Sequence, residues 1–321
     1  MAKKIDLNGG TNDDVVITPE LDDVDTIVDN TDSIISQNAQ AGTTVLGLSA
    51  AELSNPDNIM VHIADDQAPI VVLFGPTTCG KTISLIRLTR FLVKYGYTVS
   101  PIKSFRPSHD SHYAKMCEDY NMLVNSPNAA VGTNMISFML VEVLDKTGKR
   151  VCQILEAPGE YYYSPENPNR AFPSYVHTIL NSNNRKIWVY MLEPNWKDPH
   201  DRAGYVNKIK DLKTNMRAQD KAVFLYNKVD ETKYVMSPGH VNLNLVIADV
   251  KQMYPGIFVP FMNQNPITKL FKKYNCSLVP FSNGAFPNGT DASGNTVKKF
   301  IQGVDEYPRL LWSNILKLVR G

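Results

Sequence analysis

The chain has 321 residues, 43% of them hydrophobic, and a formal net charge of +1, which allows one large domain or two small ones with a sizeable core. No stretch approaches the roughly 20 apolar residues of a membrane span, and the polar N-terminus lacks the apolar segment of a secretory signal. The four cysteines (Cys79, Cys117, Cys152 and Cys276) lack paired spacing, which argues against disulfides or a zinc knuckle and favours the reducing cytoplasm.

Charge is distributed unevenly along the chain. Residues 1–66 hold thirteen of the 32 acidic residues but only two of the 33 basic ones, so residues 67–321 carry a formal charge of +12. A basic body suits phosphates or an acidic partner, but its basic residues are dispersed, which argues against nucleic-acid binding. Residues 1–45 lack aromatic residues and are interpreted as a disordered acidic tail. Residues 46–66 are interpreted as an adaptor, and residues 67–321 as the main domain.

From residue 67 onward, apolar strands alternate with amphipathic helices. Residues 70–74 form a continuous apolar run, typical of a central strand buried on both faces. Further strands are expected at 97–103, 135–144, 151–156, 187–192, 222–226 and 277–281, and helices at 81–95, 112–124, 171–181, 201–219, 243–253, 267–274 and 307–319. The short turn at 145–149 predicts an antiparallel hairpin. This order predicts a three-layer α/β fold: a mostly parallel sheet with one antiparallel hairpin strand and helices on both faces.

The first motif directly follows the apolar strand and opens the first helix. It matches the phosphate-binding pattern G-x-x-x-x-G-K-[ST] without a departure and consists of Gly75, Pro76, Thr77, Thr78, Cys79, Gly80, Lys81 and Thr82. Glycines let the backbone curl so that its N–H groups point at phosphate oxygens. Lys81 supplies a point charge for the β- and γ-phosphates, and Thr82 offers a hydroxyl to Mg²⁺. The helix start adds its positive dipole end.

The second motif lies at the end of a later strand. Asn227, Lys228, Val229 and Asp230 follow the strand expected at 222–226. A carboxylate at Asp230 accepts hydrogen bonds from both the ring N1–H and the exocyclic amine of guanine. Adenine offers no such donor pair, so a buried carboxylate facing adenine would stay unpaired at a cost. The motif therefore predicts guanine recognition.

These two motifs, in this order, resemble those of the Ras-like GTPases of the TRAFAC class. Residues 156–159 (Glu-Ala-Pro-Gly) stand where the family has D-x-x-G, and residues 282–284 (Ser-Asn-Gly) stand where it has S-A-K. The hairpin at 135–156 is also the family's arrangement, and the resemblance covers residues 68–320. It implies a P-loop NTPase fold of a divergent, bacterial-type small GTPase, with GTP or GDP and Mg²⁺ as ligands. It also adds Gly159, Ser282 and Asn283 to the nucleotide-binding residues.

The resemblance further implies the residues of hydrolysis. Thr133 is the expected first-switch threonine, and with Thr82 and Glu156 it would complete the Mg²⁺ shell. Glu160 occupies the position of the family's water-orienting glutamine, so the expected catalytic residues are Lys81, Thr133 and Glu160. An ionised glutamate cannot donate a hydrogen bond and acts as a base only if its pKa is raised. Slow turnover of GTP to GDP and phosphate, stimulated by a partner, is therefore expected.

Several alternatives stay open at the level of sequence. Tyr161, Tyr162 and Tyr163 fall in the second switch, where they would either form a partner surface or pack beneath the loop. Arg106 and Arg170 are candidates for an arginine supplied in cis. A P-loop small-molecule kinase is an alternative to the GTPase, although the sequence shows no arginine-rich lid. In a second alternative, the protein is a non-hydrolysing nucleotide-binding module whose glutamates mark lost turnover.

Overall fold

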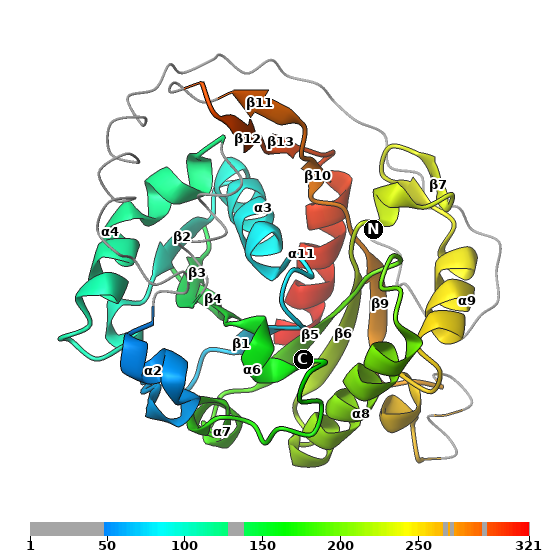
Figure 1. The fold of residues 1–321 in the computed structure, drawn as a ribbon, viewed down its shortest axis with the longest axis horizontal. Helices are drawn as coiled ribbons and strands as arrows, with labels where there is room; N and C mark the ends of the chain where they lie inside the picture. Colours follow the sequence, from blue (N-terminus) through cyan, green and yellow to red (C-terminus); the bar gives the residue numbers. More distant parts are fainter. Residues whose placement is uncertain (1–47, 128–137, 266–268, 270–272, 291–293, 321) are drawn as a thin grey trace.

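The computed structural model describes residues 48–127, 138–265, 269, 273–290 and 294–320. Its centre is a seven-stranded sheet (Figure 1). The strand order is β2 (Thr98–Pro101), β3 (Met139–Leu144), β4 (Arg150–Glu156), β1 (Ile70–Phe74), β5 (Lys186–Leu192), β6 (Lys221–Tyr226) and β9 (Ser277–Pro280). β3 pairs antiparallel with β2 and β4, whereas the pairs from β4 to β9 are parallel. The prediction of a mostly parallel sheet with one antiparallel hairpin strand is confirmed.

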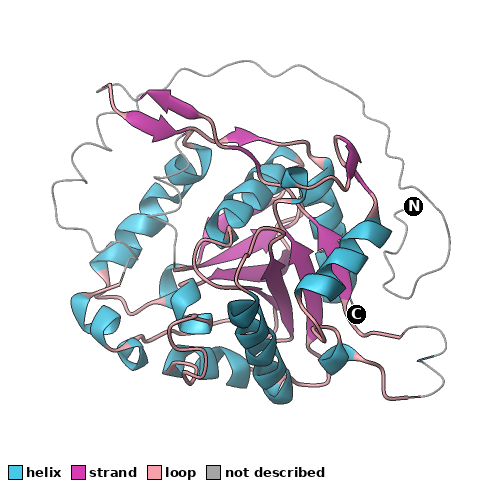
Figure 2. Cartoon of the chain, turned by 45° about the vertical axis from the view of Figure 1, so that its right-hand side comes forward, coloured by secondary structure: helices cyan, strands magenta, loops and turns pink. Residues whose placement is uncertain are grey.

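Helices cover both faces of this sheet. α3 and α11 lie on one side, and α7 and α8 lie on the other (Figures 1 and 2). The helices are α2 (Ala50–Ser54), α3 (Lys81–Lys94), α4 (Ser111–Asn125), α6 (Gly159–Tyr162), α7 (Ser174–Asn181), α8 (Pro199–Asn215), α9 (Leu243–Met253) and α11 (Glu306–Arg320). The three-layer α/β prediction is therefore confirmed. No helix among the described residues is long and apolar enough to cross a membrane.

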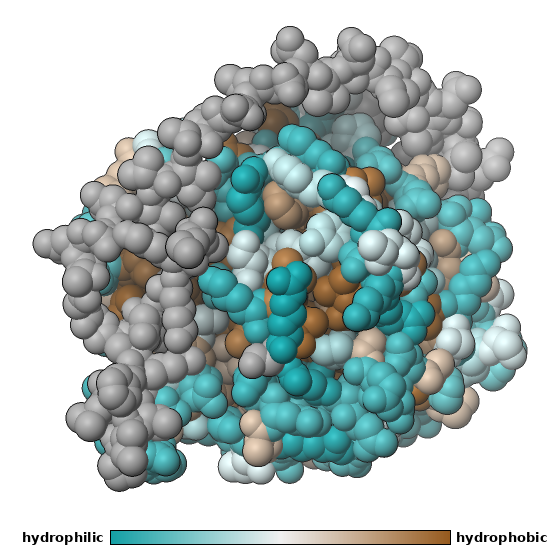
Figure 3. All heavy atoms as spheres, turned by 180° about the vertical axis from the view of Figure 1, so that it is seen from behind, coloured by the Kyte–Doolittle hydropathy of each residue, from teal (hydrophilic) through white to brown (hydrophobic). Residues whose placement is uncertain are grey.

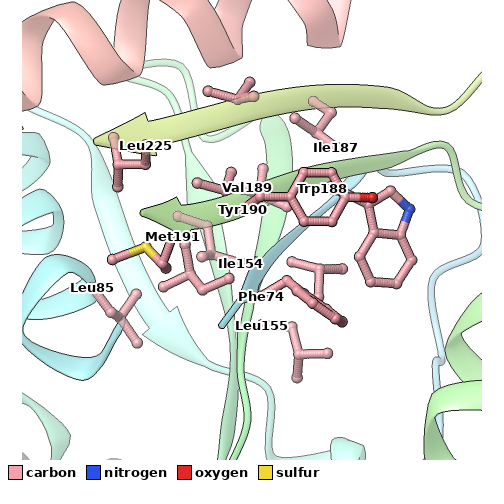
Figure 4. Packing of buried hydrophobic residues seen from close by; sticks show 14 of the residues in the cluster. Phe74, Leu85, Ile154, Leu155, Ile187, Trp188, Val189, Tyr190, Met191 and Leu225 are labelled. Atoms are coloured by element: carbon pink, nitrogen blue, oxygen red, sulfur yellow. The ribbon is translucent and has the colours of Figure 1, made fainter. Parts of the chain in front are cut away.

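The core explains why the central strands are apolar along their whole length. Every residue of β1 and β5 is buried. Successive side chains of a strand point to opposite faces, so Trp188 and Tyr190 share one face with Phe74, at ring-centroid distances of 6.2 and 5.4 Å. Leu85 of α3 and Met191 pack on the opposite side (Figure 4). Each central strand thus needs apolar side chains on both faces.

The structure also contains small hairpins that the sequence analysis missed. They pair β7 (Val235–Ser237) with β8 (His240–Val241), β10 (Gly284–Ala285) with β13 (Ile301–Gln302), and β11 (Asn288–Thr290) with β12 (Thr296–Lys298). Each strand has only two or three residues, too few for an alternating pattern to be recognised. The two later hairpins form an insertion between β9 and α11, at the top of Figure 1.

Most element boundaries agree with the expectations to within a few residues. α8 begins two residues earlier than expected, at Pro199, because Asp198 caps it by accepting from two backbone N–H groups, and it ends four residues earlier, at Asn215. Thr133, and most of the helix expected at 267–274, lie outside the described residues. Tyr274 itself forms an isolated β-bridge with Met262 rather than part of a helix.

The segment before β1 packs against the rest of the chain. Leu48 and Ile59 are buried in the same core cluster as the central strands. The acidic segment 1–45 lies outside the described residues. Seen from behind, the described surface is largely hydrophilic, with hydrophobic residues in patches between (Figure 3). Because Leu48 and Ile59 are buried in the shared core, residues 48–66 are part of the packed body.

Candidate functional site

The phosphate-loop motif forms a tight curve between β1 and α3. Gly80, which directly precedes α3, has φ of +89°, and Thr78 has φ of +62°. A Cβ atom at Gly80 would lie 2.5 Å from the side-chain nitrogen of Asn227. Glycine is therefore required both by the backbone conformation and by this close approach. Successive N–H groups in such a curve make an anion-binding concavity at the start of the helix.

Lys81 lies inside the curve of this loop. Its side chain is only 6% exposed, and its Nζ donates to the carbonyl oxygens of Gly75 at 3.1 Å and Pro76 at 2.8 Å. These bonds hold the ammonium group against the loop backbone. The loop therefore combines a fixed positive charge with converging backbone donors, a combination suited to phosphate.

Glu156, at the end of β4, reaches the phosphate loop directly. Its Oε1 accepts a hydrogen bond of 2.9 Å from the hydroxyl of Thr82. The side chain is 2% exposed, and its Oε2 has no hydrogen-bond partner among the described residues. Burial raises the pKa of Glu156 to about 8, although Lys81 and the Thr82 bond act in the opposite direction. A buried carboxyl with an unsatisfied oxygen next to a threonine hydroxyl is a candidate cation ligand.

Gly159 brings the segment 156–159 against the phosphate loop. A Cβ atom there would lie 2.3 Å from the carbonyl carbon of Pro76 and 2.4 Å from the backbone nitrogen of Thr77. Both neighbours are backbone atoms, which cannot rotate away as a flexible side chain can. Any residue larger than glycine would therefore displace either α6 or the phosphate loop. Glu160, the next residue of α6, lines the cavity beside this contact.

The loop after β6 is connected to the phosphate loop by side-chain amides. Asn227, which is fully buried, donates from Nδ2 to the carbonyl oxygen of Cys79 at 3.0 Å. Its Oδ1 accepts from Nδ2 of Asn283 at 3.1 Å. Lys228 has φ of +57°, and its Nζ lies 2.5 Å from a carboxylate oxygen of Glu193. The three loops after β1, β6 and β9 are thus held in one arrangement.

One cavity of about 590 Å³ joins these loops. Its lining contains Asp230, which is exposed, and residues from the phosphate loop and from the segments 156–159, 227–230 and 282–284. The lining residues are Thr77, Thr78, Gly80, Lys81, Thr82, Ile83, Glu156, Pro158, Gly159, Glu160, Asn227, Lys228, Asp230, Glu231, Asn283, Gly284 and Phe286. Of the other expected binding residues, Gly75, Pro76 and Cys79 build the same loop, and Ser282 is buried beside Asn283. Thr133 lies outside the described residues.

Phe286 is a lining residue that the sequence analysis did not identify. It belongs to the insertion after β9, in a stretch rich in Gly, Asn and Pro. A lone aromatic residue in such a turn-rich stretch was the available signal, because turns seldom bury large side chains. Its relation to the cavity depends on how the insertion folds back and is not visible in the local pattern.

Arg106 does not reach the cavity. It is buried, and its guanidinium group pairs with Glu52 at 2.5 Å and Asp110 at 2.8 Å and donates to the carbonyl oxygen of Met60. These contacts tie the segment before β1 to α4. Arg170 is exposed and lies over the ring of Tyr161 at 5.7 Å. Neither arginine lines the cavity.

The three consecutive tyrosines pack inward, so of the two interpretations the packing one is correct. All three are buried. Tyr162 lies 4.7 Å from the ring of Phe74 between centroids, and the hydroxyl of Tyr163 donates to the carbonyl oxygen of Asp201 at 2.6 Å. All four cysteines are buried and none forms a disulfide, and burial raises the pKa of Cys79 to about 11. Cys79 therefore acts as a small core residue rather than a reactive thiol.

The oxygen ligands available here fit Mg²⁺. The hydroxyl of Thr82 and the carboxyl of Glu156 are hard oxygen donors, and Mg²⁺ is usually held by one or two carboxylates together with substrate phosphates and water. No group of three or more His, Cys, Asp or Glu side chains gathers for a metal within the described residues. A dedicated all-protein metal cage is therefore not seen in this part of the chain.

The sequence matches no protein-family model and no curated protein. Among solved structures, it is similar to a Plasmodium falciparum protein described as nucleolar GTP-binding protein 1, at 11% identity and a TM-score of 0.36, over 80% of this chain and 90% of that one. It is also similar to the S. cerevisiae Ski7 GTPase-like domain bound to GDP and inorganic phosphate, at 12% identity and a TM-score of 0.42. That alignment covers 85% of this chain and 52% of the Ski7 chain, about half of its length.

Proposed function

We propose that this chain binds GTP and GDP and acts as a slow GTPase that serves as a nucleotide-dependent switch. The observation that carries the proposal is the single cavity lined both by the phosphate loop and by Asn227, Lys228 and Asp230. A nucleotide has a charged phosphate end and a base end, and this cavity offers a matching group for each. A simple anion site would need only the phosphate loop.

At the phosphate end, the loop N–H groups and Lys81 bind the β- and γ-phosphates. Thr82 and Glu156 would hold Mg²⁺, which would neutralise charge on the phosphate oxygens. The pKa of Glu156 is raised by burial, so its proton must leave before the carboxylate can serve as a ligand. The Thr82–Glu156 hydrogen bond keeps the two ligands together.

At the base end, Asp230 accepts from N1–H and the exocyclic amine of guanine. Asn227 positions this loop by bonding to the carbonyl of Cys79, so base and phosphate recognition share one rigid link. Lys228 is anchored by Glu193, which leaves its alkyl stem free to cover the base.

Slow hydrolysis follows from the residue beside the phosphates. Glu160 lines the cavity at the position where a glutamine would orient the attacking water. Stimulation by a protein partner at the switch regions, with Thr133 sensing the γ-phosphate, completes this proposal. The N–H of Gly159 would also sense the γ-phosphate, because a Cβ atom at Gly159 would already meet the backbone of Pro76 and Thr77 in the phosphate loop.

The test is nucleotide binding measured by thermal shift with Mg²⁺ and GTP, GDP or ATP. A ligand at 100 times its dissociation constant adds about 2.7 kcal/mol of apparent stability. We expect guanine nucleotides to raise the melting temperature, ATP to have little effect, and Asp230→Ala to abolish this preference. Asp211→Ala, at an exposed carboxylate of α8, is the matched control and should behave as wild type. An equal or larger shift with ATP would refute guanine recognition and favour the kinase alternative.

Turnover is tested separately by phosphate release from GTP. Slow release that is lost in Lys81→Ala supports the GTPase. Tight GTP binding without any release supports the non-hydrolysing module instead.

A further inference from the structure

The insertion after β9 places an aromatic ring in the nucleotide cavity. Phe286 lines the cavity together with Lys228, Asp230 and Asn283. Its side chain is 37% exposed, unlike the large majority of aromatic side chains in this fold. An exposed ring at the base end of a nucleotide cavity calls for a physical explanation.

Phe286 is supported from behind by a second ring. The rings of Phe286 and Phe300 are stacked, with centroids 5.3 Å apart and an interplanar angle of 9°. Phe300 is buried, and the guanidinium carbon of Arg90 lies 4.9 Å from its centroid. Arg90 is itself fixed by hydrogen bonds to the carbonyl oxygens of Val124 and Ser126. Phe300 covers one face of the Phe286 ring, so the exposed part of that ring is its opposite face and its edge.

The insertion is held together at its base and is tied to α3. Gly284 has φ of +123°, and a Cβ atom there would lie 2.2 Å from the carbonyl oxygen of Ile301. On the other side of the hairpin, the buried guanidinium of Arg87 donates to Gln302 and Gly303 and pairs with Asp305 at 2.7 Å. These contacts fix the ring relative to the cavity in advance, so little ordering entropy is lost when a ligand stacks on it.

We propose that Phe286 is a base-stacking residue whose free face packs against the purine ring of the bound nucleotide. The inference rests on the proposed function and extends it, because the base would be read at its edge by Asp230 and covered on its face by Phe286. Every purine has a π-face, so stacking strengthens binding without choosing between guanine and adenine. Stacking on the insertion thus adds affinity for any purine nucleotide, and the loop after β6 selects the base.

The test compares Phe286→Ala, Phe286→Leu and Phe286→Tyr in nucleotide titrations of the full chain with GDP, GTP and ATP. Loss of base–aromatic stacking should raise the dissociation constant roughly 5- to 100-fold. We expect Ala and Leu to weaken GDP and GTP binding alike, Tyr to bind as wild type, and the GTP-to-ATP preference to be unchanged. Ile301→Ala is the matched control, because Ile301 is 56% exposed on the same hairpin but does not line the cavity.

A second readout reports stacking directly. In Phe286→Trp, GDP should quench the fluorescence of the new indole beyond any change in the wild type, whose own tryptophans are Trp188, Trp196 and Trp312. If wild type binds guanine nucleotides while Phe286→Leu binds equally well, the ring is only a volume filler and the stacking inference is overturned. Unquenched fluorescence in a nucleotide-bound Phe286→Trp would overturn it too, and the exposed ring would then be a protein contact. If wild type binds no nucleotide at all, the proposed function itself fails.

Discussion

Glu156→Gln should change how the stability of this protein depends on pH. Gln keeps the size of the side chain and an oxygen that can accept the Thr82 hydrogen bond, but it cannot ionise. In the native protein, burial raises the pKa of Glu156 from 4.5 to about 8. The substitution therefore isolates the effect of one buried carboxyl.

The sign and size of the effect follow from proton linkage. Between pH 4.5 and about 8 the unfolded chain has released this proton while the folded chain retains it, so the free energy of unfolding falls as pH rises. The stabilising contribution is complete below pH 4.5 and is lost through pH 8. Each pKa unit is worth about 1.4 kcal/mol. From pH 5 to 7.5 the free energy of unfolding of the wild type should thus fall by about 3 kcal/mol relative to that of Glu156→Gln.

The assay is urea denaturation from pH 5 to 8 in EDTA without nucleotide, so that no ligand obscures the carboxyl. Comparing the two proteins at each pH cancels titrations that they share, including that of Lys186, whose pKa burial lowers to about 8. Glu166→Gln makes the same chemical change at an exposed site and should unfold in parallel with the wild type. Parallel pH profiles for wild type and Glu156→Gln would refute the buried, protonated carboxyl.

Four further substitutions test the packing at and away from the site. Gly159→Ala should lower both the melting temperature and nucleotide affinity, because its Cβ would lie 2.3 Å from backbone of Pro76; wild-type binding would contradict that contact. Tyr162→Phe removes a buried hydroxyl that has no partner among the described residues, so the free energy of unfolding should stay unchanged or rise. Tyr163→Phe removes a 2.6 Å hydrogen bond and should lower the free energy of unfolding by about 1 kcal/mol in urea denaturation. The reverse order would refute the hydrogen-bond assignment. Arg106→Gln removes the buried guanidinium that pairs with the half-buried carboxylates of Glu52 and Asp110, and it should cost about 1–3 kcal/mol. The rate of GTP turnover per folded molecule should not change; a selective loss of turnover would instead indicate a catalytic arginine.

Much of the fold could be predicted from the sequence, because it depends on local patterns. A continuous apolar run predicted β1 with the bounds observed, since a central parallel strand is buried on both faces. The phosphate loop was visible because Gly80 must adopt a positive φ between a strand and a helix. Parallel strands end at the same edge of a sheet, so motifs at the ends of β1, β4, β6 and β9 meet in one cavity.

Local patterns thus predicted the order of strands and helices along the chain, the phosphate loop, and the motif residues at the strand ends, whereas the order of the strands within the sheet came from the structure. The tertiary structure alone decided that the three tyrosines pack inward, that Arg106 pairs with Glu52 and Asp110, and that Phe286 lines the cavity. Periodicity and turn preference describe neighbours along the chain. In contrast, Arg106 and Glu52 are 54 residues apart, and Thr82 and Glu156 are 74 apart. Such pairs form only when separate elements dock, because burial and hydrogen bonding depend on every surface that encloses them.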